Sequence, residues 1–241
     1  MVIKSGQEQH ESEQDASLRS ESGQLGPQRS LVLIRHGTTS WNVEKKYLGH
    51  TDIGLLPDAQ EELAVLREQC RDLTWDAVYC SDLLRCRQTL AHIAPQAAAQ
   101  TRLDRRLREN DFGLWEGLTY EQLKHNPMYR SWIDHPQEVT PPGGEAWSAF
   151  AERIDSFLDE HLCSDETSLL SGEVGKPLPR TSLRTLIVTH GGVIRYMLSR
   201  LLDGVGFWDT HVIPGQAIQV HMEKQSGRWL GSRVTFPSIG L

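Results

Sequence analysis

Two short, strongly apolar runs constrain the fold of this chain more than any other feature. LVLI at 31–34 is followed by Arg35, His36 and Gly37, and TLIVT at 185–189 is followed by His190 and Gly191. A continuous apolar run of this length is typical of a strand buried on both faces, as in parallel sheets covered by helices. The runs therefore predict an α/β fold in which both histidines follow the carboxyl ends of strands.

Further strands and helices alternate along the chain. Strand-like runs occur at 76–81, 216–223 and 228–236, and apolar residues recur at helical spacing in 59–70, 83–93, 147–158 and 192–202. This alternation predicts a three-layer α/β/α fold, with a mostly parallel sheet and helices on both faces. Ser81 is expected to be the N-cap of the helix that follows it.

The region from Leu107 to Gly144 breaks the alternation. It mixes glycine, proline and tryptophan with short amphipathic pieces, and long irregular segments in compact domains are usually functional. Ligands of parallel sheets bind beyond the carboxyl ends of the strands. We therefore expect a short cap, an insertion near 110–145, over these ends.

The domain boundaries follow from composition. Residues 1–29 are rich in Glu, Gln and Ser and almost free of large apolar residues, which predicts a disordered tail before one domain at 30–241. The tail lacks the apolar core of a secretory signal, so we expect the protein in the cytoplasm. Turn-forming residues at 163–182 predict a surface insertion.

Charge and composition exclude several functions. The formal net charge of −7 argues against nonspecific nucleic-acid binding, and no apolar run approaches the roughly 18 residues of a membrane span. The four cysteines, Cys70, Cys80, Cys86 and Cys163, have no CxxC spacing, which argues against a zinc site or disulfide framework. We expect neither nucleic acid nor a membrane as a partner. The sequence gives no basis for predicting whether the protein is a monomer or an oligomer.

The residues at the two strand ends indicate phosphate chemistry. Arg35 offers a planar fork of donors that suits phosphate oxygens, and Gly37 lets the backbone approach a ligand closely. Arg85, one turn into the helix after the 76–81 strand, can reach the same edge or simply face solvent. Imidazoles and arginines at neighbouring strand ends form a site that can bind a phosphoryl dianion and attack it.

These segments resemble the histidine phosphatase superfamily, also called phosphoglycerate mutase-like. The resemblance spans about 31–234 and rests on six segments in the family's order: LVLIRHGTTSWN, YLGHTDIGL, SDLLRCRQT, LRENDFGLWEG, PPGGEAW and IVTHGG. It implies a metal-independent phosphatase of small phosphorylated metabolites, without a cofactor.

The resemblance also implies a role for each site residue. His36 matches the nucleophile that carries the phosphoryl group, and Glu109 matches the acid that protonates the leaving oxygen. The phosphate pocket is then formed by Arg35, Asn42, Arg85, His190 and Gly191. Glu116 is the competing carboxylate, which we interpret as mainly structural. Since the arginines can supply the charge that a metal would, we predict no metal.

The length of the cap bears on the type of enzyme. Phosphoglycerate mutases carry a longer insertion that covers the site, whereas only a short segment separates Gly117 from Pro141 here. An accessible phosphohistidine is expected to react with water, which favours a hydrolase similar to α-ribazole phosphatases over a mutase or a catalytically idle phospho-ligand-binding relative. Trp115 and Trp132 either present flat surfaces to a ring of the substrate or belong to the core of the cap.

Overall fold

The computed structural model describes residues 28–163, 182–225 and 228–234. In these residues six strands form one sheet in the order β3-β2-β4-β1-β5-β6. The strands are β1 (Gln28–Arg35), β2 (Ala77–Cys80), β3 (Thr101–Leu103), β4 (Ser182–Thr189), β5 (Ala217–Gln225) and β6 (Arg228–Val234). The first four are parallel to one another, whereas β5 is antiparallel to β1 and β6 to β5. The prediction of a mostly parallel sheet is confirmed.

The register of the central strands brings the two histidine segments together. Arg35, the last residue of β1, pairs with Thr189, the last residue of β4. Both strands therefore end at the same level of the sheet, and the residues that follow, His36 and His190, emerge side by side.

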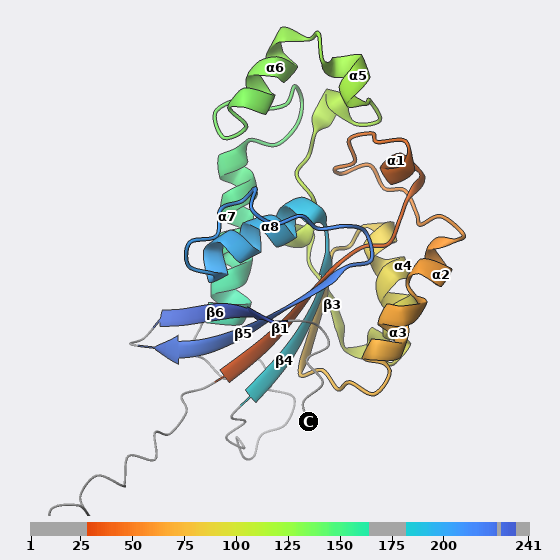
Figure 1. The fold of residues 1–241 in the computed structure, drawn as a ribbon, viewed down its shortest axis with the longest axis vertical. Coiled ribbons are helices and arrows are strands. Elements are labelled where there is room, and N and C mark those ends of the chain that lie inside the picture. The colour runs from red at the N-terminus through yellow and green to blue at the C-terminus, as the bar shows by residue number, and fades with distance from the viewer. Residues whose placement is uncertain (1–27, 164–181, 226–227, 235–241) are drawn as a thin grey trace, which may run out of the picture.

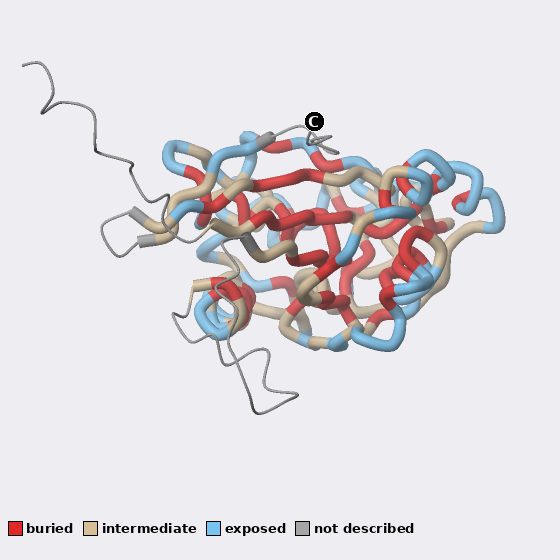
Figure 2. Tube along the Cα trace, turned by 90° about the horizontal axis from the view of Figure 1, so that it is seen from below, coloured by how far each residue is buried: buried red, intermediate tan, exposed pale blue. Residues whose placement is uncertain are grey.

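Helices cover both faces of the sheet (Figure 1). The helices that follow the strands are α3 (Ala64–Cys70) and α4 (Leu84–Ile93) on one side, and α7 (Trp147–Leu158) and α8 (Gly191–Leu201) on the other. Leu31 and Leu33 of β1 pack in the core with α7 and α8, whereas Val32 and Ile34 pack in the core with α3 and α4. Figure 2 shows the buried residues running through the interior between these layers. The predicted burial of this strand on both faces is confirmed.

The cap has a small core of its own. Its elements are η3 (Gly113–Trp115), α5 (Tyr120–Leu123) and α6 (Pro127–Asp134), and the last two lie away from the sheet in Figure 1. η2 (Arg105–Leu107) precedes the cap, and its Leu107 packs in the core with α7 and α8. Trp115, Leu123 and Tyr129 are buried together, with Trp132 packed against them. The remaining short helices are α1 (Ser40–Val43), α2 (Ala59–Glu62), η1 (Pro95–Gln100) and η4 (Asp159–Cys163).

Several local predictions differ from the structure. β1 begins at Gln28, inside the predicted tail, and the helix predicted over 59–70 is interrupted at Leu63. The prediction for Ser81 is wrong, because the N-cap of α4 is Leu83 and the Ser81 hydroxyl instead contacts His190. The rest of the predicted tail, 1–27, and nearly all of the predicted insertion at 163–182 lie outside the described residues.

All four cysteines are free, and Cys70, Cys80 and Cys86 are buried. No helix within the described ranges is long and apolar enough to cross a membrane.

Candidate active site

His36 is held at the junction of β1 and β4. Its backbone N–H donates to the carbonyl of Thr189 at 3.0 Å, and its side chain is only 3% exposed. Its Nδ1 lies 2.8 Å from the carbonyl oxygen of Gly37. Since a carbonyl can only accept, this contact assigns the ring proton to Nδ1 and leaves the lone pair on Nε2. The lone pair of Nε2 is the nucleophile that phosphoryl transfer needs.

His190 stands beside His36. The two ring centroids are 5.2 Å apart at an interplanar angle of 62°. His190 is completely buried, and its Nε2 lies 2.9 Å from the hydroxyl of Ser81. The hydroxyl fixes the orientation of a ring that the sequence predicted to complete the phosphate pocket.

Burial and positive charge keep both histidines neutral. Desolvation lowers the pKa of His36 well below its ordinary value, and the charges of Arg85 and Arg35 lower it further. The pKa of His190 is lowered in the same way, by burial first and then by the neighbouring charges. A neutral imidazole at pH 7 is the form that can attack phosphorus.

Arg85 is oriented by the loop between α1 and α2. Its Nη1 donates to the carbonyl of Thr51 at 2.9 Å and its Nη2 to the carbonyl of Gly49 at 2.6 Å, and the residue is completely buried. Its Nε is also buried, with no hydrogen-bond partner in the part of the chain that the structure describes. Buried donors without partners are rare in proteins, so this N–H is suited to an anionic oxygen.

The guanidinium of Arg35 is held in the same way as that of Arg85. Its Nη1 donates to the carbonyl of Val212 at 2.6 Å, while its Nε is buried and unpaired among the described residues. A Cβ at Gly191 would lie 3.5 Å from its guanidinium carbon, so the first turn of α8 passes close to this group. The structure thus brings Arg35, Arg85, His36, His190 and Gly191 together as predicted positions of one site.

Glu109 lies at the first turn of α8. Its Oε2 accepts from the backbone N–H of Gly192 at 2.8 Å, and its Oε1 accepts from the N–H of Asn110 at 3.0 Å. Its charge interacts with both Arg35 and Arg85. The carboxyl group is therefore at the edge of the arginine cluster, where a leaving oxygen would need a proton.

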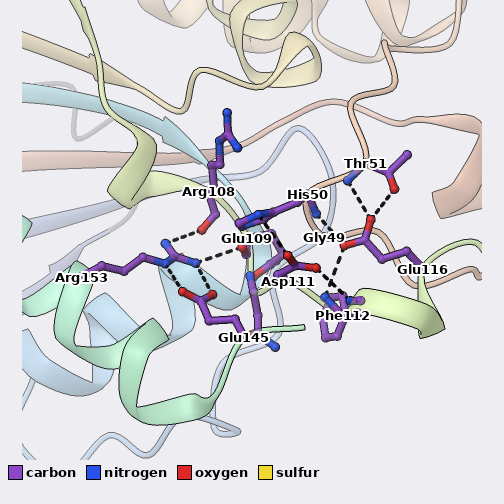
Figure 3. Close-up of polar contacts among 12 residues, drawn as sticks. Gly49, His50, Thr51, Arg108, Glu109, Asp111, Phe112, Glu116, Glu145 and Arg153 are labelled. Atoms are coloured by element: carbon purple, nitrogen blue, oxygen red, sulfur yellow. Dashed lines mark hydrogen bonds and ion pairs between the residues drawn. The ribbon is translucent and has the colours of Figure 1, made fainter. Parts of the chain in front are cut away.

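The carboxylate of Glu116, the competing candidate for the acid, binds backbone N–H groups of the protein itself (Figure 3). It accepts from the backbone N–H groups of His50 at 2.7 Å, Thr51 at 2.7 Å and Phe112 at 3.3 Å, and from the Thr51 hydroxyl. These bonds anchor the loop whose carbonyls orient Arg85. The geometry supports a structural role for Glu116 and leaves Glu109 as the candidate acid.

Asn42 has a local partner. Its Oδ1 accepts from the backbone N–H and the hydroxyl of Thr39, both at 3.0 Å, in a capping box of α1. A contact with phosphate therefore falls to the amide nitrogen of Asn42, and this role stays a prediction.

A cavity of about 270 Å³ extends from Glu109 between the cap and α8. The aromatic residues that line it are Tyr47, Phe112, Trp132, Trp147, Phe150, Phe207 and Trp208. Trp132 lines this cavity and also packs against the cap core, whereas Trp115 is 2% exposed within that core. Sequence reasoning missed Phe207 and Trp208, although the adjacent aromatic pair after a helix end was a visible signal.

Comparison with known proteins identifies the family of this chain. The sequence profile of the histidine phosphatase superfamily (branch 1) matches residues 31–234. The chain belongs to this superfamily. The prediction of a phosphatase of the superfamily is confirmed, and the roles of the individual site residues remain proposals.

Two solved structures and one further relative illustrate the likeness. The crystal structure of the alpha-ribazole phosphatase from Shigella flexneri superimposes with a TM-score of 0.70 at 25% identity, covering 88% of this chain and 98% of that chain. The protein TTHB049 from Thermus thermophilus gives a TM-score of 0.59 at 32% identity, covering 86% and 98%. Phosphoglycerate mutase-like protein 4 of Arabidopsis thaliana is 31% identical over 70% of each chain.

Proposed function

We propose that this protein hydrolyses small phosphomonoesters through a phosphohistidine on His36, and we expect it to act on phosphorylated metabolites in the cytoplasm. One observation carries the proposal. The lone pair on Nε2 of His36 lies in a buried cluster in which Arg35 and Arg85 each present an Nε–H that has no hydrogen-bond partner among the described residues. Such a cluster can hold the oxygens of a phosphoryl group around the nucleophile.

The first step transfers the phosphoryl group to the protein. The Nε2 lone pair of His36 forms a bond to phosphorus while the bond from phosphorus to the alcohol oxygen breaks in line with it. Arg35, Arg85 and His190 stabilise the charge on the three equatorial oxygens. Protonated Glu109 gives its proton to the departing alcohol oxygen and becomes a carboxylate.

The second step releases phosphate. The Glu109 carboxylate takes a proton from a water molecule, whose oxygen attacks phosphorus, and the phosphorus–nitrogen bond to His36 breaks. Inorganic phosphate leaves and the protonated acid is restored. The short cap between Gly117 and Pro141 favours this entry of water over retention of a phosphorylated intermediate, which supports a hydrolase.

The cavity beyond Glu109 supports an alcohol with a flat ring. Aromatic side chains from the cap and from the segment after α8 line it, and Trp208 at this cavity is 65% exposed. The Shigella flexneri relative is named an alpha-ribazole phosphatase. α-Ribazole phosphate, which carries a flat heteroaromatic ring, is therefore our first candidate substrate.

A phosphate-release assay over a panel of metabolites tests the function. We expect release from α-ribazole phosphate, and no sustained exchange between 2- and 3-phosphoglycerate. Activity should survive EDTA, because arginines supply the positive charge. Efficient exchange with little phosphate release would contradict the hydrolase, whereas hydrolysis of sugar phosphates alone would contradict only the substrate.

Substitution of the cavity tests the ring. Trp132→Ala and Trp208→Ala should each raise KM for α-ribazole phosphate by about five-fold, the value of a stacking contact, and change sugar phosphates little. Tyr120→Ala, an exposed aromatic of α5 outside the cavity lining, is the control. An equal rise for both classes of substrate would argue against a ring at this cavity.

A further inference from the structure

The segment that carries Glu109 is held by a side chain from another part of the chain. Arg153, on α7, donates from Nη1 to the carbonyls of Arg106 at 2.6 Å and Arg108 at 2.7 Å. Its Nη2 donates to the carbonyl of Glu109 itself at 2.9 Å. One guanidinium therefore binds three of the four backbone carbonyls of residues 106–109, the last of which is the proposed acid.

The fourth carbonyl is also held by a side chain. The hydroxyl of Thr189, at the end of β4, donates to the carbonyl of Leu107 at 2.7 Å. Since none of these four residues belongs to a strand, their position depends on side chains from α7 and β4 rather than on a sheet ladder.

Glu145 fixes the guanidinium in turn (Figure 3). Its two carboxylate oxygens accept from Nε of Arg153 at 2.7 Å and from Nη2 at 2.8 Å. With the three carbonyls, all five N–H donors of Arg153 are used. The two side chains are only 17% and 14% exposed, so this bidentate pair is shielded from water.

The segment that carries Gly144 and Glu145 also packs against the base of the cap. The backbone N–H of Glu145 donates to the carbonyl of Asp111 at 2.9 Å. A Cβ at Gly144 would stand 2.4 Å from that carbonyl oxygen, so this approach requires a glycine. The PPGGE segment therefore brings Glu145 to Arg153 and at the same time closes on the residues just after Glu109.

We infer that Arg153, oriented by Glu145, is a positioning residue for the Glu109 carboxyl group. It sets the backbone from which Glu109 reaches the N–H of Gly192 and the leaving oxygen. Arg153 is not among the residues that line the cavity, although Glu145 is, and it makes no hydrogen bond to His36, Arg35 or Arg85 in the described part of the structure. Its charge also acts on His190, and Arg153→Lys preserves this charge. Loosening it should therefore impair proton donation while phosphate binding and attack persist. The inference rests on the proposed role of Glu109.

The test compares substrates that differ in their need for an acid. We would measure kcat/KM for an alkyl phosphate and for p-nitrophenyl phosphate, whose leaving group needs little protonation. This parameter reports the steps through formation of the phosphohistidine, so release of phosphate does not enter. Arg153→Lys keeps the charge but cannot hold three carbonyls and a carboxylate together, and Arg153→Met removes the charge as well.

We expect both variants to lose about 10- to 100-fold on the alkyl phosphate, the effect of displacing a catalytic group by a fraction of an ångström to an ångström. On p-nitrophenyl phosphate the loss should stay within about three-fold. Arg200→Met is the matched control, because it breaks an ion pair between α8 and Asp155 of α7 at 2.9 Å without touching the acid segment. It should leave kcat/KM unchanged for both substrates.

Glu145→Gln and Glu109→Gln complete the experiment. Glu145→Gln keeps the shape of the side chain. It should also lose more kcat/KM on the alkyl phosphate than on p-nitrophenyl phosphate, to a smaller extent than the Arg153 variants. It provides the test if Arg153→Met does not fold. An equal loss on both substrates, or no loss in a folded Arg153→Lys protein, would overturn the inference. If Glu109→Gln itself shows no split, the proposed acid is wrong. A split in Glu109→Gln without one in Arg153→Lys refutes only the positioning role.

Discussion

The carboxylate of Glu109 accepts a hydrogen bond from the backbone N–H of Gly192 at 2.8 Å. The N–H groups of a helix's first turn have no partner within the helix, so this carboxylate satisfies one of them. A Cβ at position 192 would stand 2.2 Å from Oε1 of Glu109. The second glycine of the THGG segment is thus required by the proposed acid and not by the helix.

Gly192→Ala should therefore displace the Glu109 side chain and leave the fold intact, because alanine favours the helix. We expect kcat/KM for an alkyl phosphate to fall about 10-fold or more, with little change for p-nitrophenyl phosphate. Ser199→Ala, further along the same helix, controls for the substitution itself. Full activity of Gly192→Ala on both substrates would contradict the close contact.

Glu109→Gln should show the same selectivity more strongly. Because a general acid contributes about 10²–10⁴-fold, esters with poor leaving groups should lose activity on that scale in kcat/KM. p-Nitrophenyl phosphate should lose far less. Equal losses would move the acid to another carboxylate.

Glu116→Gln should behave differently from Glu109→Gln. The Glu116 carboxylate holds the backbone of His50 and Thr51, and the loop in turn orients Arg85. Weakening this anchor should impair phosphate binding, so we expect kcat/KM to fall by about 10-fold for alkyl and aryl esters alike. A loss confined to poor leaving groups would instead show that Glu116 donates the proton.

His36→Ala should abolish turnover, by roughly 10⁴-fold or more for loss of a nucleophile. The wild-type protein, mixed briefly with labelled substrate, should carry an acid-labile label that the variant lacks. The fold should persist, because the main-chain bond from His36 to Thr189 does not involve the side chain. Hydrolysis by a folded His36→Ala protein at the wild-type rate would rule out the phosphohistidine.

The central sheet and the histidines were predictable from short-range patterns. LVLI and TLIVT are buried on both faces, and a parallel register places the residues after them together whatever the loops do. β3 was not predicted, because a three-residue edge strand leaves no periodic pattern. Its pairing with β2 is decided by the neighbouring strand.

The supporting residues of the site were harder to predict, because each has an equally ordinary local role. A serine ahead of a helix normally caps it, yet Ser81 contacts His190 from the end of β2. An arginine on an amphipathic helix is normally solvated, yet Arg153 uses all its donors on distant carbonyls and Glu145. Such roles depend on which segments meet in space, and one sequence does not reveal these meetings.

The buried histidines make stability depend on pH. Burial, together with the charge of Arg85, lowers the pKa of His36 and of His190 well below the ordinary value of 6.5. Between the native and the unfolded pKa the unfolded chain binds more protons, so stability rises with pH in this window and is lost as pH falls below about 6.5.

Each histidine contributes a slope of up to about 1.4 kcal/mol per pH unit. Urea unfolding at pH 7.5, 6.5 and 5.5 should show the free energy of unfolding falling toward acid. His36→Gln removes one of the protonation sites with a lowered pKa, which also include His161, and should flatten this dependence by its own share. If the pH dependence of the free energy of unfolding is the same in His36→Gln as in the wild type, His36 has the same pKa in the folded and unfolded chains. That result would contradict the effect of burial and of the neighbouring arginines on this histidine.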